Sequence, residues 1–227
     1  DMLLYIIRHG ETDWNTAGRL QGGADIPLNE NGRNLARVTG EALRRVPCDL
    51  MITSPLKRAR ETGELVIAPS EKHFGRKIPV IEDERLKELS WGSWEGLGCL
   101  EENFAIPDKN FNLFYTDALH FEGAPDGESV ADLCDRTAEF WQELIHKPEY
   151  QDKIILISTH GCAMRALMNP LYDDPADFWQ GHVPFNCMVN VVEVKDGSAQ
   201  IVLGDKIYYD RSSCVDNYKA VQPDKKA

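Results

Sequence analysis

The sequence lacks three features that would each place the protein in a different class. No apolar run approaches the roughly 20 residues that a membrane-spanning helix needs, and no signal-peptide pattern opens the chain. The six cysteines form no Cys-x-x-Cys pair and no Cys/His cluster at zinc spacing. Basic residues are scarce, since 25 Lys and Arg stand against 37 Asp and Glu and give a net charge of -12.

These absences exclude classes of function. Scattered cysteines without a metal pattern are typical of a cytoplasmic protein with reduced, buried thiols, so Cys162 is expected to be a small buried hydrophobe and not a nucleophile. The acidic balance argues against nucleic acid or an anionic membrane as a partner, because both require clustered basic residues. Any anionic substrate must therefore be bound by a local basic pocket.

The length and composition are those of an ordinary globular protein. At 227 residues, with 42% hydrophobic and 27% charged residues, the chain can bury a sizeable core, and we expect a single domain over 1–227. Residues 99–127 form its least regular part and are expected to be either an inserted lid over a site or a packed flap. Residues 210–227 are expected to be a polar tail.

A short apolar run near the start of the chain stops at a polar triplet. Residues 3–7 are apolar or aromatic, too few for an independent helix and rich in strand formers, which predicts a strand buried on both faces of a parallel sheet. Arg8, His9 and Gly10 follow directly, where open α/β sheets bind ligands. Arg8 can hold an anion, and His9 can attack or shuttle a proton. A satisfied loop is the alternative for so short a motif on its own.

Two further apolar strands end in polar residues in the same way. Residues 49–53 lead into a predicted helix with Ser54 as its N-cap and Arg58 in its first turns. Residues 153–159 form the clearest buried strand and end at His160. The ends of parallel strands lie at one edge of a sheet, so two histidines and two arginines are expected to converge there.

A structured loop is expected over residues 86–96, where charged, aromatic and glycine residues alternate without a clean period. Glu88 lies in it between Leu86 and Leu89, and burial there would raise the carboxyl pKa and keep its proton available for transfer. A solvated surface carboxylate is the alternative for any one such glutamate. Glu88 is therefore a candidate acid whose role depends on what surrounds it.

The rest of the chain alternates between helices and strands. Periodicity predicts helices at residues 29–46, 130–144, 162–168 and 174–179. It predicts further strands at residues 78–81, 188–194 and 200–208, the last two joined by a hairpin turn at 195–198. Ser129 and Asp132 are expected to cap the second helix, and Asn186 either faces the site or forms a turn. The pattern predicts an α/β fold whose mostly parallel central sheet carries an antiparallel strand.

Four motifs in order carry a family resemblance. They are Arg8-His9-Gly10-Glu11-Thr12 with Asn15, Ser54-Pro55-Leu56-x-Arg58-Ala59-x-x-Thr62, Leu86-x-Glu88 ahead of Gly92-x-Trp94-Glu95-Gly96, and His160-Gly161. Through them residues 3–209 resemble the histidine phosphatase superfamily, with its phosphoglycerate mutase-like fold. The resemblance implies a three-layer α/β/α sandwich and a phosphohistidine mechanism that needs no metal and no other cofactor.

The resemblance also implies roles for individual residues. His9 would be the nucleophile, and Glu88 the general acid that later acts as the base. The remaining site residues would be Arg8, Arg58 and His160 around the phosphoryl oxygens, with Asn15, Gln21 and Gly161 as further substrate contacts. Electrostatics supports the roles of the two arginines, because a phosphate carries about -1.5 to -2 charges at neutral pH and fixed guanidinium groups stabilise that charge. Nearby arginine charges are also expected to lower the His9 pKa and keep its ring neutral.

Three functions stay open at this point. A phosphatase passes the phosphoryl group of a small phosphorylated metabolite from His9 to water, whereas a 2,3-bisphosphoglycerate-dependent phosphoglycerate mutase passes it to another hydroxyl. A non-catalytic module would keep the pocket to bind a phosphate group or a phosphoprotein. The phosphatase is favoured, because residues 99–127 are acidic and aromatic where mutases of the family carry additional basic residues. Their aromatic residues hint at an apolar leaving group, and a homodimer stays an open alternative.

Overall fold

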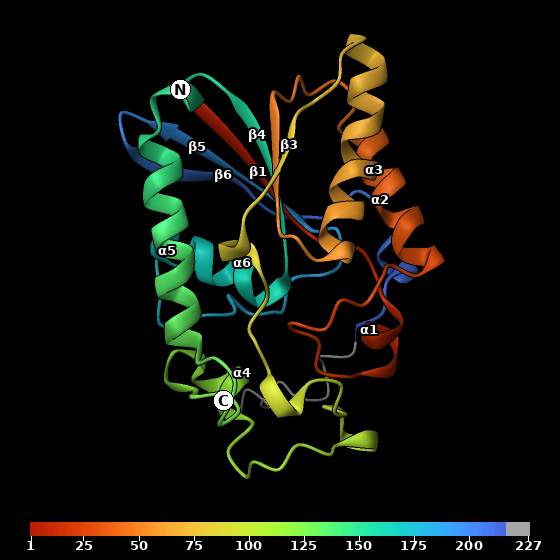
Figure 1. Ribbon diagram of the computed structural model, residues 1–227, viewed down its shortest axis with the longest axis vertical. Helices are drawn as coiled ribbons and strands as arrows, with labels where there is room; N and C mark the ends of the chain where they lie inside the picture. The colour runs from red at the N-terminus through yellow and green to blue at the C-terminus, as the bar shows by residue number, and fades with distance from the viewer. Residues whose placement is uncertain (217–227) are drawn as a thin grey trace.

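The centre of the protein is a six-stranded sheet. The computed structural model describes residues 1–216 and orders the strands β3-β2-β4-β1-β5-β6 (Figure 1). Their bounds are β1 (Met2–Arg8), β2 (Leu50–Thr53), β3 (Val80–Glu82), β4 (Ile154–Thr159), β5 (Val189–Lys195) and β6 (Ser198–Lys206). β1 to β4 pair in parallel, whereas β5 runs antiparallel to both β1 and β6. The predicted mostly parallel sheet with an antiparallel strand is confirmed.

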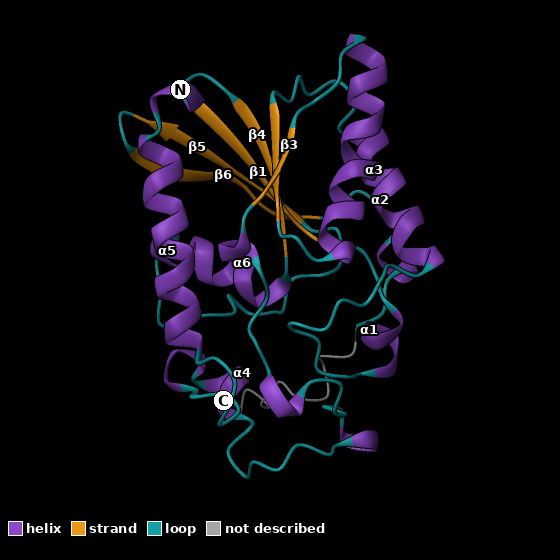
Figure 2. Cartoon of the chain, in the orientation of Figure 1, coloured by secondary structure: helices purple, strands orange, loops and turns teal. Residues whose placement is uncertain are grey.

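Helices cover both faces of this sheet, as Figure 2 shows. α2 (Glu30–Ala42) and α3 (Lys57–Phe74) lie on one face, and α5 (Val130–His146) and α6 (Gly161–Met168) lie on the other. Two short helices, α1 (Asp13–Ala17) and α4 (Leu113–Thr116), lie beyond the sheet's edge in Figure 1. The fold is therefore the three-layer α/β/α sandwich that the resemblance implied.

The side chains of β1 show why this strand needs a layer on each side. Met2, Leu4 and Ile6 are fully buried in the cluster that contains residues of α5 and α6. Ile7 is fully buried in the opposite cluster, with residues of α2 and α3. Successive strand residues point to opposite faces, so a continuous apolar run requires apolar cover on both. The interpretation of residues 3–7 as a strand buried on both faces is confirmed.

Most element boundaries follow the predicted caps and turns. Asn29 and Ser129 accept the expected amide hydrogen bonds at the starts of α2 and α5. In the hairpin between β5 and β6, Asp196 and Gly197 have φ values of 51° and 75°. Both angles lie in the left-handed region that a two-residue hairpin turn favours.

Some boundary predictions were wrong. Residues 174–179 form turns and no helix, because the Gln180 side-chain amide donates from Nε2 to the carbonyls of Asp174 and Asp177 and so satisfies acceptors that a helix would have used. α2 ends at Ala42, four residues early, and the strand predicted at 78–81 lies at Val80–Glu82. α3 begins at Lys57 with Leu56 as its N-cap, so Ser54 is not the N-cap.

The predicted polar tail at 210–227 lies only partly within the described structure. Residues 217–227 lie outside the described part, and Cys214 in the remainder is buried.

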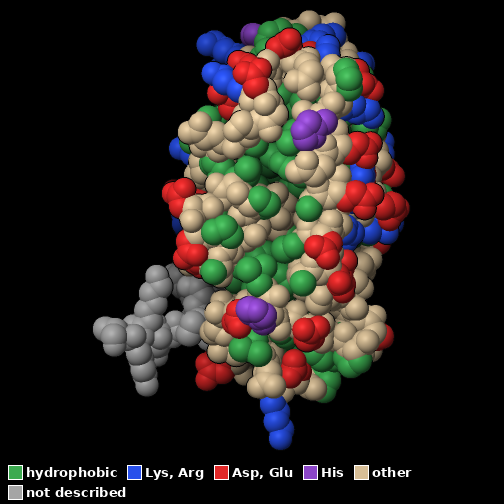
Figure 3. All heavy atoms as spheres, turned by 90° about the vertical axis from the view of Figure 1, so that its left-hand side faces the viewer, with side chains coloured by type: hydrophobic (Ala, Val, Ile, Leu, Met, Phe, Trp, Pro, Cys, Tyr) green, Lys and Arg blue, Asp and Glu red, His purple; other side chains and the backbone are tan. Residues whose placement is uncertain are grey.

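The described part of the chain contains no helix that is long and apolar enough to cross a bilayer. On the face that carries α5, Figure 3 shows acidic side chains along both margins, with basic ones interspersed and not gathered in one broad patch.

Candidate active site

Three neighbouring strands deliver polar residues to one edge of the sheet. β4 pairs with β1 on one side and β2 on the other, so the segments after these strands leave the sheet side by side. Arg8, His9, Arg58 and His160 all lie there and are at least 95% buried. The rings of His9 and His160 have centroids 5.2 Å apart. The structure thus brings the two histidines and the two arginines together at this edge of the sheet.

His9 is held in one tautomer by its own loop. Its Nδ1 lies 2.6 Å from the carbonyl oxygen of Gly10, which can only accept, so Nδ1 carries the hydrogen and Nε2 keeps its lone pair. Burial first, and then the charges of Arg58 and Arg8, hold the His9 pKa well below its usual range. The predicted neutral imidazole is supported, with burial as the larger cause.

His160 is oriented by Ser54. Its Nε2 lies 2.9 Å from Ser54 Oγ, and the same oxygen accepts a hydrogen bond from the Leu56 amide at 3.3 Å. The hydroxyl of Ser54 can donate to Nε2, and in that arrangement the ring hydrogen lies on Nδ1. That nitrogen is buried and has no partner in the described structure. An oxyanion beside the two rings would supply the missing acceptor.

The two arginines are fixed by backbone carbonyl groups. Arg58 donates from Nη1 to Ala24 at 2.6 Å and from Nη2 to Gly22 at 2.7 Å, while its buried Nε has no partner in the described structure. Burial lowers the Arg58 pKa to about 10, so the group stays charged at neutral pH. Arg8 donates to the carbonyl of Pro184. A Cβ atom at Gly161 would lie 3.2 Å from Arg8 Nε, so any larger residue there would press on this guanidinium.

The Glu88 side chain is partly buried, and its carboxylate lies against the start of α6. Its carboxylate accepts hydrogen bonds from the amides of Leu89 at 2.9 Å, Cys162 at 3.0 Å and Ala163 at 2.9 Å. Burial raises the Glu88 pKa, and these amides together with Arg8 and Arg58 oppose that rise. Glu88 is therefore a partly buried acid whose ionised form is also stabilised, as a group that acts as acid and base in turn requires.

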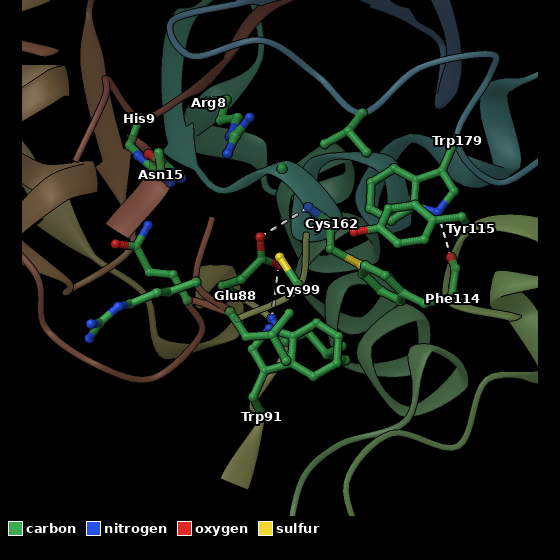
Figure 4. Close-up of a pocket in the computed structure, with 16 residues that line it drawn as sticks. Arg8, His9, Asn15, Glu88, Trp91, Cys99, Phe114, Tyr115, Cys162 and Trp179 are labelled. Atoms are coloured by element: carbon green, nitrogen blue, oxygen red, sulfur yellow. Dashed lines mark hydrogen bonds between the residues drawn. The ribbon is translucent and has the colours of Figure 1, made fainter. Parts of the chain in front are cut away.

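A single pocket joins these groups to an aromatic wall. Figure 4 shows Arg8, His9 and Asn15 on one side of it, Glu88 in the middle, and Phe114, Tyr115 and Trp179 on the other side. Its remaining lining residues are Arg19, Leu20, Gln21, Leu89, Trp91, Cys99, Gly161, Cys162 and Val183. Asn15 and Gln21 line this pocket, whereas Arg58 and His160 are buried next to His9 and are not among the lining residues.

The segment 99–127 supplies much of the aromatic wall. Phe111 and Phe114 are buried, and Phe114 lies 5.0 Å from Trp91 and 5.2 Å from Trp179 between ring centroids. Trp179 Nε1 also donates to the Phe114 carbonyl at 2.7 Å. These contacts pack the aromatic residues of the segment against the pocket. Whether the segment opens as a lid stays a prediction.

Comparison with known proteins decides the family. The model of the histidine phosphatase superfamily (branch 1) matches residues 4–205. The chain belongs to the histidine phosphatase superfamily. It is 31% identical to the uncharacterized phosphatase PhoE of Bacillus subtilis, over 82% of this chain and 86% of that one. It is 34% identical to a 2,3-bisphosphoglycerate-dependent phosphoglycerate mutase of Gloeobacter violaceus, over 74% of this chain and 75% of that one. Its fold matches that of Bacillus stearothermophilus YhfR with a TM-score of 0.79, at 32% identity over 91% of this chain and 98% of that one.

Several further residues of the chain support the site in ways that the sequence did not reveal. Thr62 Oγ1 accepts the Gly10 amide at 2.8 Å and so fixes the loop after β1. Asn186 donates to the His9 carbonyl at 3.1 Å, which settles its position at the site. Thr62 was visible only as a motif position, Ser54 as a motif position and an expected N-cap, and Asn186 gave no signal that separated a site residue from a turn. The hydrogen bonds from the α6 amides to Glu88 could not be predicted, because every residue except proline has a backbone amide and the sequence does not show which of them bind a side chain.

One alternative for the site, a nucleophilic Cys162, is answered by the structure. Burial raises the pKa of the Cys162 thiol well above its usual value, and Cys162 contributes its backbone amide to Glu88. A thiol in that state is a poor nucleophile, as expected. Among the described residues, no group of three or more His, Cys, Asp or Glu side chains could hold a metal ion.

Because its histidines at the site are buried and neutral, we expect the folded protein to lose stability in acid. The folded protein keeps His160 neutral, whereas the unfolded chain binds a proton below about pH 6.5. Stability is therefore fully present above that pH and falls as the pH drops through it. We expect urea denaturation to give wild type a steeper loss than His160→Gln between about pH 7 and 5, by up to about 1.4 kcal/mol per pH unit. The variant of an exposed histidine, His73→Gln, should follow wild type, and parallel curves for wild type and His160→Gln would contradict the prediction.

Proposed function

We propose that the protein is a phosphomonoesterase that hydrolyses a small phosphorylated metabolite through a phosphohistidine on His9. The observation that carries this proposal is the tautomer of His9. A buried, neutral ring with its Nδ1 hydrogen bound to Gly10 directs the Nε2 lone pair away from its own loop. Two buried guanidinium groups lie beside it, and the partly buried carboxyl group of Glu88 lines the same pocket.

In the first step, the Nε2 lone pair of His9 attacks phosphorus and the bond from phosphorus to the ester oxygen breaks. The leaving oxygen takes the proton of the Glu88 carboxyl group and departs as an alcohol. Arg8, Arg58 and the Nδ1 hydrogen of His160 stabilise the charge on the phosphoryl oxygens in flight. Positioning and electrostatic stabilisation of this kind account for most of the catalysis of phosphoryl transfer.

In the second step, the Glu88 carboxylate takes a proton from a water molecule whose oxygen attacks phosphorus. The bond between phosphorus and Nε2 breaks, inorganic phosphate leaves, and His9 regains its lone pair. Glu88 is again protonated, so the cycle closes without a net change in the enzyme. The three amides that face the Glu88 carboxylate favour its ionised form between the two steps.

The pocket supports hydrolysis over mutase activity. A phosphoglycerate mutase must bind a carboxylate and a second phosphate as well as the phosphoryl group in transfer. Of the residues that line the pocket, Arg8 and Arg19 are the cationic ones, and Arg8 is assigned to the transferred group. A mutase nevertheless stays the second candidate, because the Gloeobacter relative carries that name. A non-catalytic binding module would have no use for an acid such as Glu88.

The aromatic wall supports an apolar leaving group. Phe114, Tyr115 and Trp179 face the catalytic groups across the pocket. Apolar and aromatic linings bind ligands of matching surface and leave few polar groups to fix orientation. We therefore propose a substrate whose alcohol is apolar or aromatic. Among named relatives is a phosphoserine phosphatase of Hydrogenobacter thermophilus, 31% identical over 78% of this chain, so polar alcohols belong in the test.

Location and partners complete the proposal. All six cysteines lie in the described part of the chain, five of them are buried, and none is in a disulfide. Reduced buried thiols support a cytoplasmic location. The charge of -12 supports a small-molecule substrate without nucleic acid or membrane as a partner, and a homodimer stays an open alternative.

The role of Glu88 can be tested with two esters of similar size. In Glu88→Gln we expect kcat/KM for benzyl phosphate, whose alcohol needs a proton, to fall by about 10²- to 10⁴-fold. The loss on p-nitrophenyl phosphate should be at least ten times smaller, because nitrophenolate leaves with little protonation. His9→Ala is the control that should abolish both activities. Equal losses of Glu88→Gln on the two esters would remove Glu88 from the acid role.

The substrate proposal can be tested with a panel of phosphomonoesters in the presence of EDTA. We expect His9-dependent phosphate release, with kcat/KM for aryl and benzyl esters about tenfold or more above that for phosphoserine and 3-phosphoglycerate. Such a ratio corresponds to the burial of one or two extra apolar groups. Isomerisation of 3-phosphoglycerate that depends on added 2,3-bisphosphoglycerate would make the protein a mutase. A requirement for added metal would contradict the site assignment.

A further inference from the structure

One arginine outside the pocket contacts the backbone of the loop that carries Glu88. Arg136, on α5, donates from Nη1 to the carbonyls of Arg85 at 2.8 Å and Lys87 at 2.7 Å. Its Nη2 donates to the carbonyl of Glu88 itself at 3.1 Å. Three of the four residues from 85 to 88 are thus bound through their backbone by one side chain.

The guanidinium group is itself fixed by Glu128. Arg136 Nε lies 2.9 Å from Glu128 Oε2, and Nη2 lies 2.7 Å from Oε1, which makes a bidentate pair. Glu128 also holds the far end of the loop, because its amide donates to the Ser90 carbonyl at 2.9 Å and its carboxylate accepts the Ser90 amide at 3.3 Å. The five N–H groups of the guanidinium match five acceptor contacts, and a lysine ammonium with three N–H groups could not replace them.

This contact matters because the loop has little regular structure of its own. Glu88 lies between two single-turn 3₁₀ helices, Glu84–Leu86 and Gly92–Trp94, and no strand pairs with it. A catalytic group must nevertheless stay within about 0.5 Å of its working position, because a shift of about 1 Å can cost on the order of 100-fold in rate. Neither Arg136 nor Glu128 lines the pocket.

We propose that Arg136, held by Glu128, is the positioning residue for the general acid. It touches no substrate and acts by fixing the backbone from residue 85 to residue 88, which aims the Glu88 carboxyl group at the leaving oxygen. The inference rests on the proposed acid role of Glu88. It gives a role in catalysis to a half-buried ion pair between Arg136 of α5 and Glu128, just before that helix, and none of the four motifs contains either residue.

The test compares Arg136→Met and the milder Arg136→Lys with wild type on benzyl and p-nitrophenyl phosphate. Arg33→Met is the matched control, because Arg33 forms a half-buried pair with Glu61 far from the Glu88 loop along the chain. We expect kcat/KM of Arg136→Met to fall on the order of 10- to 100-fold on benzyl phosphate and less than about threefold on p-nitrophenyl phosphate. Arg136→Lys should show the same selectivity to a smaller degree, and Arg33→Met should show none.

A double variant separates positioning from general damage. In Glu88→Gln the acid is already lost, so adding Arg136→Met should lower benzyl phosphate activity no further. Equal losses on both esters in Arg136→Met and Arg136→Lys, or additive losses in the double variant, would overturn the inference. If Glu88→Gln alone is selective while the Arg136 variants are not, only the positioning role fails. If Glu88→Gln is not selective, the acid assignment fails and the inference fails with it.

Discussion

The parallel pairing of β4 with β1 and β2 is the constraint on which the site depends. It brings the segments after three strands to one edge and buries two histidines and two arginines there. Burying such charges is costly unless hydrogen bonds compensate, and the carbonyls of Gly22, Ala24 and Pro184 provide them. The result is a fixed positive field in a region shielded from water, where electrostatic interactions are stronger than in solvent. The same burial lowers the pKa values of His9 and His160 and keeps both rings neutral. Burial at this edge therefore both strengthens the positive field and keeps the nucleophile in its reactive form.

The Glu88 carboxyl group experiences opposing influences that suit a group with two roles. Burial favours its protonated form, whereas the α6 amides and the two arginines favour its ionised form. Helix N-termini commonly bind anionic ligands, and here two of those amides bind a side chain of the protein itself. Arg136 acts at the other end of the same residue, on its backbone carbonyl. Glu88 is therefore held at both ends by groups that lie on two different helices.

Sequence patterns predicted the fold well and brought the candidate site residues to one edge of the sheet, and they failed where tertiary contacts decide. The run at residues 3–7 and the hairpin turn at 195–198 were predictable because burial on two faces and positive φ angles leave clear signatures. The helix predicted at 174–179 failed because the Gln180 side chain satisfies carbonyls locally. Ser54 resembled an N-cap and instead orients His160, a contact between residues 106 positions apart. The α6 amides and the role of Arg136 could not be predicted either, because both involve backbone groups, which every sequence contains.

The measurement that tests the central claim most directly is capture of the enzyme intermediate by rapid quench with ³²P-labelled substrate, followed by ³¹P NMR of the isolated phosphopeptide. Our account predicts an acid-labile phosphoramidate on His9, on Nε2 and not on Nδ1, because Gly10 occupies the Nδ1 hydrogen. It also predicts that the label passes to water as inorganic phosphate at the rate of turnover. Label on Nδ1, on another residue, or on no residue at all would contradict the mechanism. Transfer of the label to a second hydroxyl of the substrate would contradict the phosphatase assignment.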